Sequence, residues 1–246
     1  MITISHKYLH TNNWNIKQDC AIGNILFRIA GTIGIAIKNG FDYGFHEWEN
    51  QKYFINELPK IVVTTLPIIN VPQNYKGYDI GYQEFDIQDN TEIFGYMGSP
   101  KYFDHCESII KYYFKMKPLC KVYKDTILIH YRNYQNPAFY SLTTYYTEAL
   151  KLLPEKRIVV VTDNIEAARN AIGIDCEYIS NSPIEDLYLL TQADYLILSN
   201  STFSWWGAWL SNAQIIIAPN HWFSGEFSDA PFDLTDFYLD SWKKIK

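Results

Sequence analysis

One stretch of the chain, residues 194–210, restricts the fold more than any other. It reads as an apolar run, DYLILS, then the polar triplet NST, and then the bulky sequence FSWWGAWL. A short apolar run followed by turn residues is typical of a buried strand in a parallel sheet. Ser201 or Thr202 stands where a helix N-cap belongs, ahead of a tryptophan-rich helix. The stretch therefore predicts a strand, a tight polar loop and a helix start, and doubly wound sheets bind ligands at such strand ends.

The predicted helix start suits a phosphate or diphosphate group. The first turn of a helix has N–H groups without intrahelical partners, and its dipole favours an anion. The hydroxyls of Ser201 and Thr202 stand beside those groups. The alternative is that these hydroxyls only cap a core helix, which is the commoner use of such a pair. Three tryptophans within five residues are likewise usually found in a core.

Composition narrows the class of protein. The chain has 246 residues, of which 17% are aromatic and 20% charged, and its formal net charge is −6. This is a globular composition, long enough for one large domain or two small ones. The negative charge argues against general affinity for nucleic acid.

Neither a secretory signal nor a membrane span is predicted. Polar residues follow the first five residues, and the most apolar helical run, Ile22–Ile37, contains Asn24 and Arg28 and is too short to cross a bilayer. The four cysteines form no CxxC pair and have no histidine at metal-ligand spacing. We therefore expect reduced thiols and a cytoplasmic protein.

Alternating strand and helix patterns predict an α/β fold. The order strand, loop, helix, strand at the start of the chain is that of a βαβ unit, and a break within 117–125 precedes a second α/β half. We therefore expect two domains, residues 1–122 and 123–246. Besides the stretch 194–210, strands are expected at 2–5, 41–45, 93–96, 126–130, 157–162, 178–180 and 215–218, a loop at 6–19, and helices at 20–38, from 104 onward, and at 141–153, 165–172 and 182–192.

Polar side chains are expected at the carboxyl ends of two strands. His130 and Arg132 end the strand that begins at residue 126, and Asp163 follows the strand 157–162. An arginine fork can neutralise a phosphate, a histidine can bond a phosphate or a base, and an aspartate can accept both N–H groups on the edge of guanine. The simpler readings are a surface His–Arg pair and an N-cap at Asp163. The chain has no Asp-x-Asp pair, so no metal is expected.

The sequence SNSTFSWWGAWL, followed by IIIAP and Trp222-Phe223, resembles the C-terminal motif of the α1,2-fucosyltransferase family, inverting enzymes that use GDP-fucose. Three weaker segments also resemble family motifs, namely 21–24, 95–103 and 130–135. In the second, Gly98 replaces a glutamine. In the third, Asn133 and Gln135 stand where the family has an arginine and an aspartate, so one cation and one carboxylate are missing.

The resemblance implies two Rossmann-like halves facing each other in the GT-B architecture, the first on the acceptor side and the second binding the GDP-sugar. It implies transfer of L-fucose from GDP-β-L-fucose to a glycan hydroxyl in α1,2 linkage with inversion, without metal or other cofactor. The expected partners are thus a nucleotide sugar and a glycan acceptor. Arg132 would stabilise the leaving GDP, and the expected donor-binding residues are Asn24, His130, Arg132, Asp163, Asn164, Ser201, Thr202 and Phe203.

The general base and the extent of activity stay open. Asp42, His46 and Glu47 lie near the end of the second expected strand and are candidate bases. The first alternative is a catalytically weakened or inactive module that binds a GDP-sugar or a glycan and lost activity with Asn133 and Gln135. The second is a transferase for another GDP-sugar.

Overall fold

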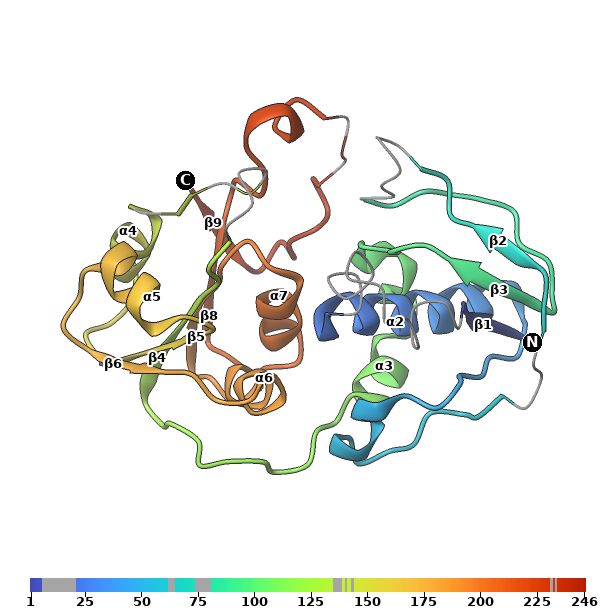
Figure 1. Cartoon of the computed structure of the whole chain (residues 1–246), viewed down its shortest axis with the longest axis horizontal. Helices are drawn as coiled ribbons and strands as arrows, with labels where there is room; N and C mark the ends of the chain where they lie inside the picture. Colours follow the sequence, from blue (N-terminus) through green and yellow to red (C-terminus); the bar gives the residue numbers. More distant parts are fainter. Residues whose placement is uncertain are drawn as a thin grey trace. The chain divides into compact units, whose positions relative to one another are not determined.

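The computed structural model describes residues 1–5, 21–61, 65–73, 81–134, 139, 141–142, 144–230, 232 and 234–246. The chain divides into two compact units (Figure 1). The first unit is Met1–Lys117 with Pro231–Phe237, and the second is Pro118–Ala230 with Tyr238–Lys246. The boundary expected at 122–123 lies a few residues after Lys117, and the return of 231–237 to the first unit was not expected from the sequence.

A six-stranded sheet forms the centre of the second unit, and every pair of neighbouring strands in it runs parallel. The strand order is β6-β5-β4-β7-β8-β9, so β4 lies between β5 and β7. Leu128 of β4 pairs with Val159 on one side and with Leu196 on the other. The strands are β4 (Thr126–Tyr131), β5 (Arg157–Thr162), β6 (Glu177–Ile179), β7 (Tyr195–Ile197), β8 (Ile215–Pro219) and β9 (Lys243–Ile245).

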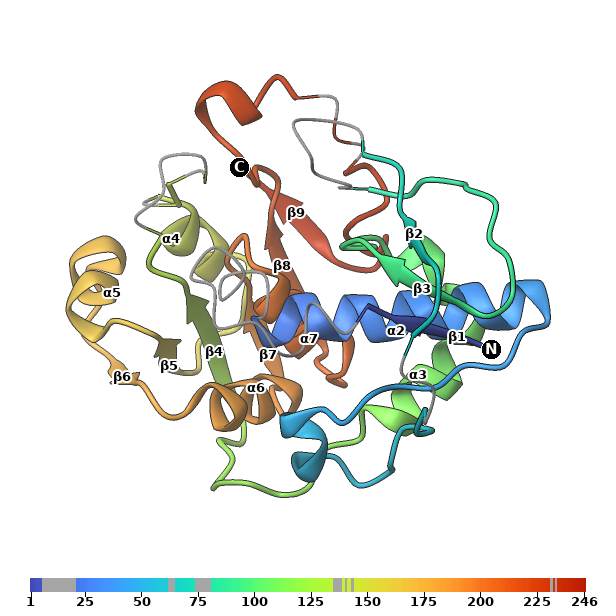
Figure 2. The same ribbon diagram turned by 45° about the vertical axis from the view of Figure 1, so that its right-hand side comes forward.

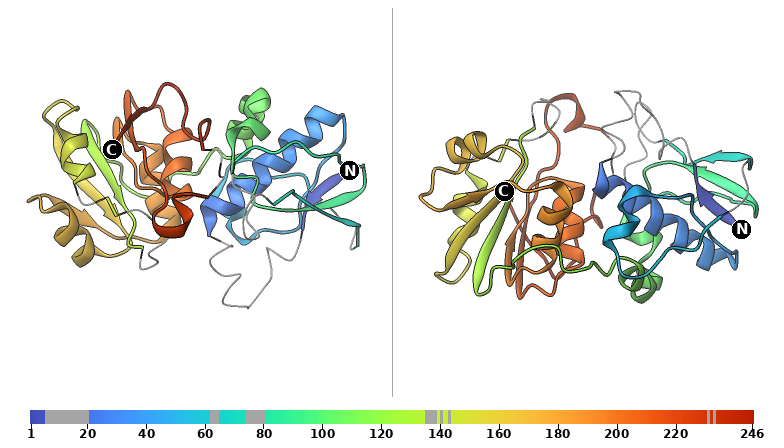
Figure 3. Two further views of the ribbon diagram at one scale, coloured as in Figure 1. Left: turned by 90° about the horizontal axis from the view of Figure 1, so that it is seen from above. Right: turned by 60° about the horizontal axis from the view of Figure 1, so that its bottom comes forward.

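Helices cover both faces of this sheet, with α4 and α5 on one face and α6 and α7 on the other (Figures 1 and 3). The buried strands carry apolar residues toward both layers, as expected of a doubly wound sheet. α6 and α7 approach so closely that a Cβ added at Gly207 would lie 2.5 Å from the Cβ of Leu190. The helices are α4 (Tyr145–Leu150), α5 (Ile165–Ile172), α6 (Pro183–Thr191) and α7 (Thr202–Trp209), with the 3-10 turn η5 (Gly225–Phe227).

A three-stranded parallel sheet, in the order β1-β3-β2, forms the first unit together with the long helix α2 (Ile22–Asn39). α2 runs alongside β1 (Figure 2) and ends at Gly40, which adopts the left-handed conformation that favours glycine. The other elements are β1 (Ile2–Ile4), β2 (Ile68–Asn70), β3 (Thr91–Phe94), η2 (Glu49–Tyr53), η3 (Pro100–Tyr102), η4 (Asp104–Cys106) and α3 (Glu107–Tyr113).

The structure confirms the predicted α/β class and corrects several elements. The strand expected at 41–45 is reduced to two single bridges, Tyr43 with Ile2 and Phe45 with Lys60. Because the two bridges go to different neighbours, no ladder forms. The helix expected from residue 104 starts as the 3-10 turn η4 and becomes α-helical only at Glu107.

Other differences between the expected and the observed elements lie in segments whose hydrophobic periodicity is weak. The helix expected at 141–153 is shorter in the structure, where α4 ends at Leu150. Pro154 disfavours the helical conformation at the preceding residue, Leu153, so the helix ends before it. The short strands β2 and β9 were not expected. The loop expected at 6–19 lies outside the described residues. Among the described helices, none combines the length and the hydrophobicity that crossing a bilayer requires.

Candidate functional site

The carboxyl ends of β5, β4 and β7, which are neighbours in the sheet, carry most of the residues that the sequence singled out. His130 belongs to β4 and Arg132 follows it. Asp163 and Asn164 follow β5, and the triplet Ser201, Thr202 and Phe203 follows β7 at the start of α7. Parallel strands end at a common edge, so these side chains share one edge of one sheet.

Arg132 and Asp163 form an ion pair across this edge, through Nη1 of the guanidinium and Oδ2 of the carboxylate. The other carboxylate oxygen of Asp163 accepts the backbone N–H of Asn133 at 2.9 Å. The N-cap of α5 is Asn164, whose side chain accepts the N–H of Ala167 at 3.0 Å. The capping alternative for Asp163 is therefore wrong, and its carboxylate instead orients the loop after β4.

His130 is buried and contacts both the loop after β7 and the start of α7. Its Nδ1 lies 2.8 Å from the hydroxyl of Ser199 and 2.5 Å from that of Ser204, and its ring stacks on Phe203 with centroids 5.2 Å apart. Burial, assisted by the nearby charge of Arg132, lowers the pKa of His130 to about 3. The imidazole is therefore neutral near pH 7, and it ties the loop after β7 and the start of α7 to the end of β4.

The hydroxyl of Ser201 accepts the N–H of Phe203 at 3.2 Å, so Ser201 is the N-cap of α7. Asn200, just before it, donates from its side-chain amide to the carbonyl of Trp222 at 2.9 Å. Thr202 is half-buried at the first position of the helix. The capping reading is thus correct for Ser201, and it leaves the helix terminus, with its dipole, directed at the carboxyl edge of the sheet.

The tryptophans of α7 belong to the core. Trp205 and Trp206 are both fully buried, and their rings meet edge to face at 5.0 Å. Trp209 stacks on Trp205, and Trp242, just ahead of β9, lies 5.7 Å from the same ring. The cluster therefore supports α7 and the loop before it from within.

Sequence reasoning missed Tyr134, which joins the two sides of the site. Its hydroxyl donates to the carbonyl of Asn200 at 3.3 Å, and its ring lies 5.8 Å from the guanidinium of Arg132. The same ring stacks on Phe139 at 3.9 Å, and Phe139 in turn lies beside Phe223. The available signal was its position two residues after Arg132, because alternate residues of an extended chain point to the same side.

Asp186, in the first turn of α6, is another buried polar residue that the sequence did not indicate. It is 7% exposed and accepts the side-chain amide of Asn181 at 2.9 Å. Burial raises its pKa to about 6, and the nearby carboxylates of Glu185 and Asp163 act in the same direction. A carboxyl group held this way ionises in the folded protein only at a cost in stability.

The remaining expected residues lie elsewhere. Asn24 is in the first turn of α2, in the first unit, and its part in donor binding stays a prediction. Gln135 lies outside the described residues. Of the candidate bases, Asp42 accepts the N–H of Ile2 through its carbonyl, which puts it at the amino end of β1. His46 and Glu47 stay predictions.

No three carboxylate, histidine or cysteine side chains gather into a possible metal site within the ranges that the structure describes. The expectation that the reaction needs no metal or other cofactor stays a prediction.

Comparison with known proteins finds a family similarity in the second half of the chain. Residues 139–246 match the model described as Glycosyl transferase family 11. This part of the chain is therefore similar to glycosyl transferase family 11. The predicted resemblance to the fucosyltransferases is thereby confirmed at the level of the family.

Two relatives from Escherichia coli are each 31% identical to the chain. The O-antigen biosynthesis glycosyltransferase WbnK aligns over 110 residues, 40% of this chain and 34% of its own length. An alpha-1,2-colitosyltransferase aligns over 170 residues, 57% of this chain and 59% of its own length. The chain thus spans about a third and about three-fifths of these relatives.

The crystal structure of the fucosyltransferase NodZ from Bradyrhizobium is similar, with a TM-score of 0.52 and 15% identity, covering 78% of this chain and 90% of that one. At this identity the likeness speaks for the fold alone. It confirms the predicted α/β architecture of the GT-B type.

Proposed function

We propose that this protein is a glycosyltransferase that moves L-fucose from GDP-β-L-fucose to a glycan hydroxyl in α1,2 linkage, with inversion and without a metal. The observation that carries the proposal is the common sheet edge at which Arg132, paired with Asp163, meets the capped start of α7. Asp163 and the start of α7 lie within residues 139–246, which match the model of glycosyl transferase family 11, and Arg132 lies shortly before them.

In this proposal the diphosphate of the donor binds between Arg132 and the start of α7. A guanidinium carries five N–H donors in a rigid fork, and Asp163 occupies only the side of Nη1. The hydroxyl of Thr202 supplies a further donor beside the positive end of the helix dipole. Asp163, fixed by the backbone of Asn133, holds the guanidinium in a defined direction.

The chemical step is a single in-line displacement. The acceptor hydroxyl forms a bond to the anomeric carbon of fucose while the bond from that carbon to the diphosphate breaks, through an oxocarbenium-like state. Negative charge grows on the departing GDP, and Arg132 and the helix dipole stabilise it where it develops. A base must take the proton of the acceptor hydroxyl.

One observation favours a second donor. The 31% identity to an alpha-1,2-colitosyltransferase extends over 170 residues, so a related deoxysugar in place of fucose is the second candidate. The residues that carry the proposal, Arg132 and the start of α7, address the diphosphate and not the sugar. The two candidates therefore differ in the sugar that reaches the product and not in the way GDP is held.

The test incubates the purified protein with EDTA, a lactose-type acceptor, and either GDP-fucose or a GDP-linked colitose. Released GDP and the mass of the product are measured for each donor. Fucosylated product with EDTA present supports the proposal, and product from the colitose donor alone selects the second candidate. GDP binding without product from either donor, across several glycan acceptors, replaces both with the binding-module alternative.

A further inference from the structure

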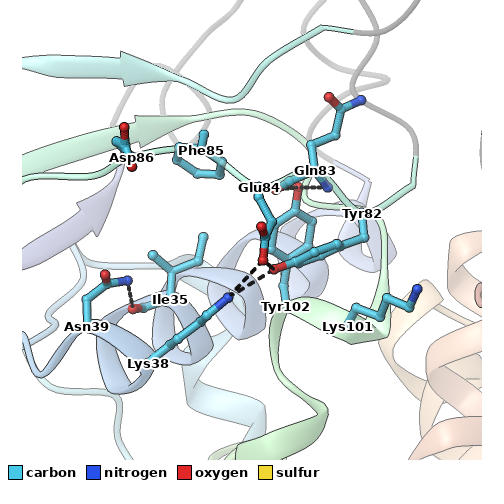
Figure 4. Close-up of a pocket in the computed structure, with 10 residues that line it drawn as sticks. All are labelled: Ile35, Lys38, Asn39, Tyr82, Gln83, Glu84, Phe85, Asp86, Lys101 and Tyr102. Atoms are coloured by element: carbon cyan, nitrogen blue, oxygen red, sulfur yellow. Dashed lines mark hydrogen bonds and ion pairs between the residues drawn. The ribbon is translucent and has the colours of Figure 1, made fainter.

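A pocket of about 390 Å³ lies on the first unit, away from the residues discussed so far. Three pieces of chain form its walls, namely the last turns of α2, the segment 82–86, and Lys101 with Tyr102 at η3 (Figure 4). The volume is at the small end of the range of about 300–1,000 Å³ for small-molecule sites. It suits a ligand of one or two rings.

Hydrogen bonds tie the walls together, so the pocket is largely preformed. The hydroxyl of Tyr102 accepts the backbone N–H of Gln83 at 3.0 Å and donates to its carbonyl at 3.2 Å. The ammonium of Lys38, from α2, donates to the hydroxyl of Tyr82 at 3.2 Å and to the carboxylate of Glu84 at 3.4 Å. Each wall therefore holds the next, which lowers the ordering cost of binding.

The pocket alternates aromatic surface with hydrogen-bonding groups. Tyr82 and Tyr102 pack with ring centroids 4.9 Å apart, and Phe85 follows on the same segment beside Ile35 (Figure 4). The Tyr82 hydroxyl, the Glu84 carboxylate and the Lys38 ammonium meet at one point next to these rings. Donors and acceptors next to ring faces are what a sugar requires, because a pyranose has a face of C–H groups and a rim of hydroxyls that both donate and accept.

The charges favour a neutral ligand over a phosphorylated one. The pocket is lined by two lysines, Lys38 and Lys101, and by two acids, Glu84 and Asp86, so its formal charges cancel. Lys38 is bonded to Glu84, and Lys101 is paired with Asp236. Both ammonium groups already have carboxylate partners, and a phosphate would have to compete with them.

The position of the pocket separates it from the expected reaction site. The backbone N–H of Ile2, at the start of β1, bonds to the carbonyl of Asp42 just after α2, so α2 ends near the amino end of β1. Lys38 lies fourteen residues beyond Asn24, a rise of about 21 Å along the helix. The pocket is thus remote from the end of α2 that the family resemblance connects with the donor.

From these observations we propose that the pocket formed by Tyr82, Glu84, Phe85, Tyr102 and Lys38 is an accessory binding site for a neutral carbohydrate. It holds a sugar without reacting it. The site belongs to the first unit alone, so the proposal does not depend on whether the second unit transfers a sugar.

The test titrates the full chain with lactose, maltose and chitobiose, and follows binding by saturation-transfer NMR. At least one of them is expected to bind weakly, and Phe85→Ala or Glu84→Gln is expected to weaken that binding about three- to tenfold, as for the loss of one aromatic or one hydrogen-bonded contact. The matched controls, Tyr112→Ala and Glu107→Gln, remove an exposed ring and an exposed carboxylate of the same unit outside the pocket. They are expected to leave binding unchanged.

GDP affinity, measured on the same preparations, reports on the second unit and on folding. GDP affinity is expected to be equal in all four variants. A loss of sugar binding with unchanged GDP binding therefore concerns the pocket, and a loss of GDP binding concerns the donor site or folding. The proposal is overturned when none of the three sugars binds, when the pocket variants bind as the controls do, or when glucose 6-phosphate binds the pocket more tightly than glucose.

Discussion

Replacing Arg132 tests the proposed donor site most directly, because this side chain places a cation at the carboxyl edge beside α7. Charge-assisted hydrogen bonds contribute about 1.5–3 kcal/mol. The Arg132 side chain is 44% exposed and is paired with Asp163. Both facts place the expected loss of binding free energy in the lower half of that range. For Arg132→Ala we therefore expect GDP binding weaker by about 1.5–2 kcal/mol, or about 10- to 30-fold.

The structure offers a matched control for this variant. Arg157, at the first position of β5, also pairs with an acid, Glu177, and its side chain is 62% exposed. Arg157→Ala removes the same charge from the opposite end of the sheet, and GDP affinity should not change. Arg132→Lys keeps the charge but loses the fork, so it should recover part of the affinity and no more.

The assay is titration calorimetry with GDP at two salt concentrations and with EDTA present throughout. The effect of Arg132→Ala should shrink at high salt, because a partly exposed ion pair is screened. Equal GDP affinity in wild type and Arg132→Ala, or the same loss in Arg157→Ala, refutes the assignment. Loss of all binding on adding EDTA to the wild type refutes the metal-free site.

Three further predictions concern the core, a buried acid and turnover. Trp206→Ala should cost about 3–5 kcal/mol in the urea unfolding free energy, because the ring is fully buried; unchanged stability with lost GDP affinity would make the ring a ligand contact. Asp186 has a folded pKa of about 6, above its value in the unfolded chain, so its ionisation removes stability as pH rises from about 4 to 6. Asp186→Asn should therefore be more stable than wild type at pH 8, by up to about 3 kcal/mol, and equal to it at pH 3; an equal difference at both pH values contradicts this. Asn133→Arg should raise the rate of transfer at saturating donor, by up to the roughly 10²–10³ that one charge stabiliser is worth, and a neutral or slower variant means that Asn133 only shapes the loop.

Local signals allowed much of the second unit to be predicted. The helix expected at 165–172 is α5, with Gly173 beyond its end, and the helix expected at 182–192 is α6, which starts with a capping box of Ser182 and Glu185. The buried strands β4 and β5 followed from their continuous apolar runs. In each case the residues that decide the element lie within the element or next to it.

Features that depend on distant contacts could not be predicted. β9 is a strand because Lys243 and its neighbours pair with β8, although the sequence KKI has no strand-like alternation. His130 lies within hydrogen-bond distance of Ser199 and Ser204, which are about seventy residues away in the sequence. No local sequence pattern predicts this contact. The choice of Asn164 over Asp163 as N-cap is equally a matter of where the helix begins, since either residue type can cap.

The electrostatics of the carboxyl edge give a physical reason to expect slow turnover. His130 is uncharged near pH 7, because burial holds its pKa at about 3, and the charge of Arg132 is balanced by Asp163. The formal charge of these three groups is therefore zero, and the positive potential that remains comes from the start of α7, roughly half an elementary charge. A second arginine at position 133, as in the family pattern, would leave a net cation facing the departing diphosphate. Asn133 instead offers Asp163 its backbone N–H, so we expect the site to hold GDP but to have less charge with which to stabilise its departure.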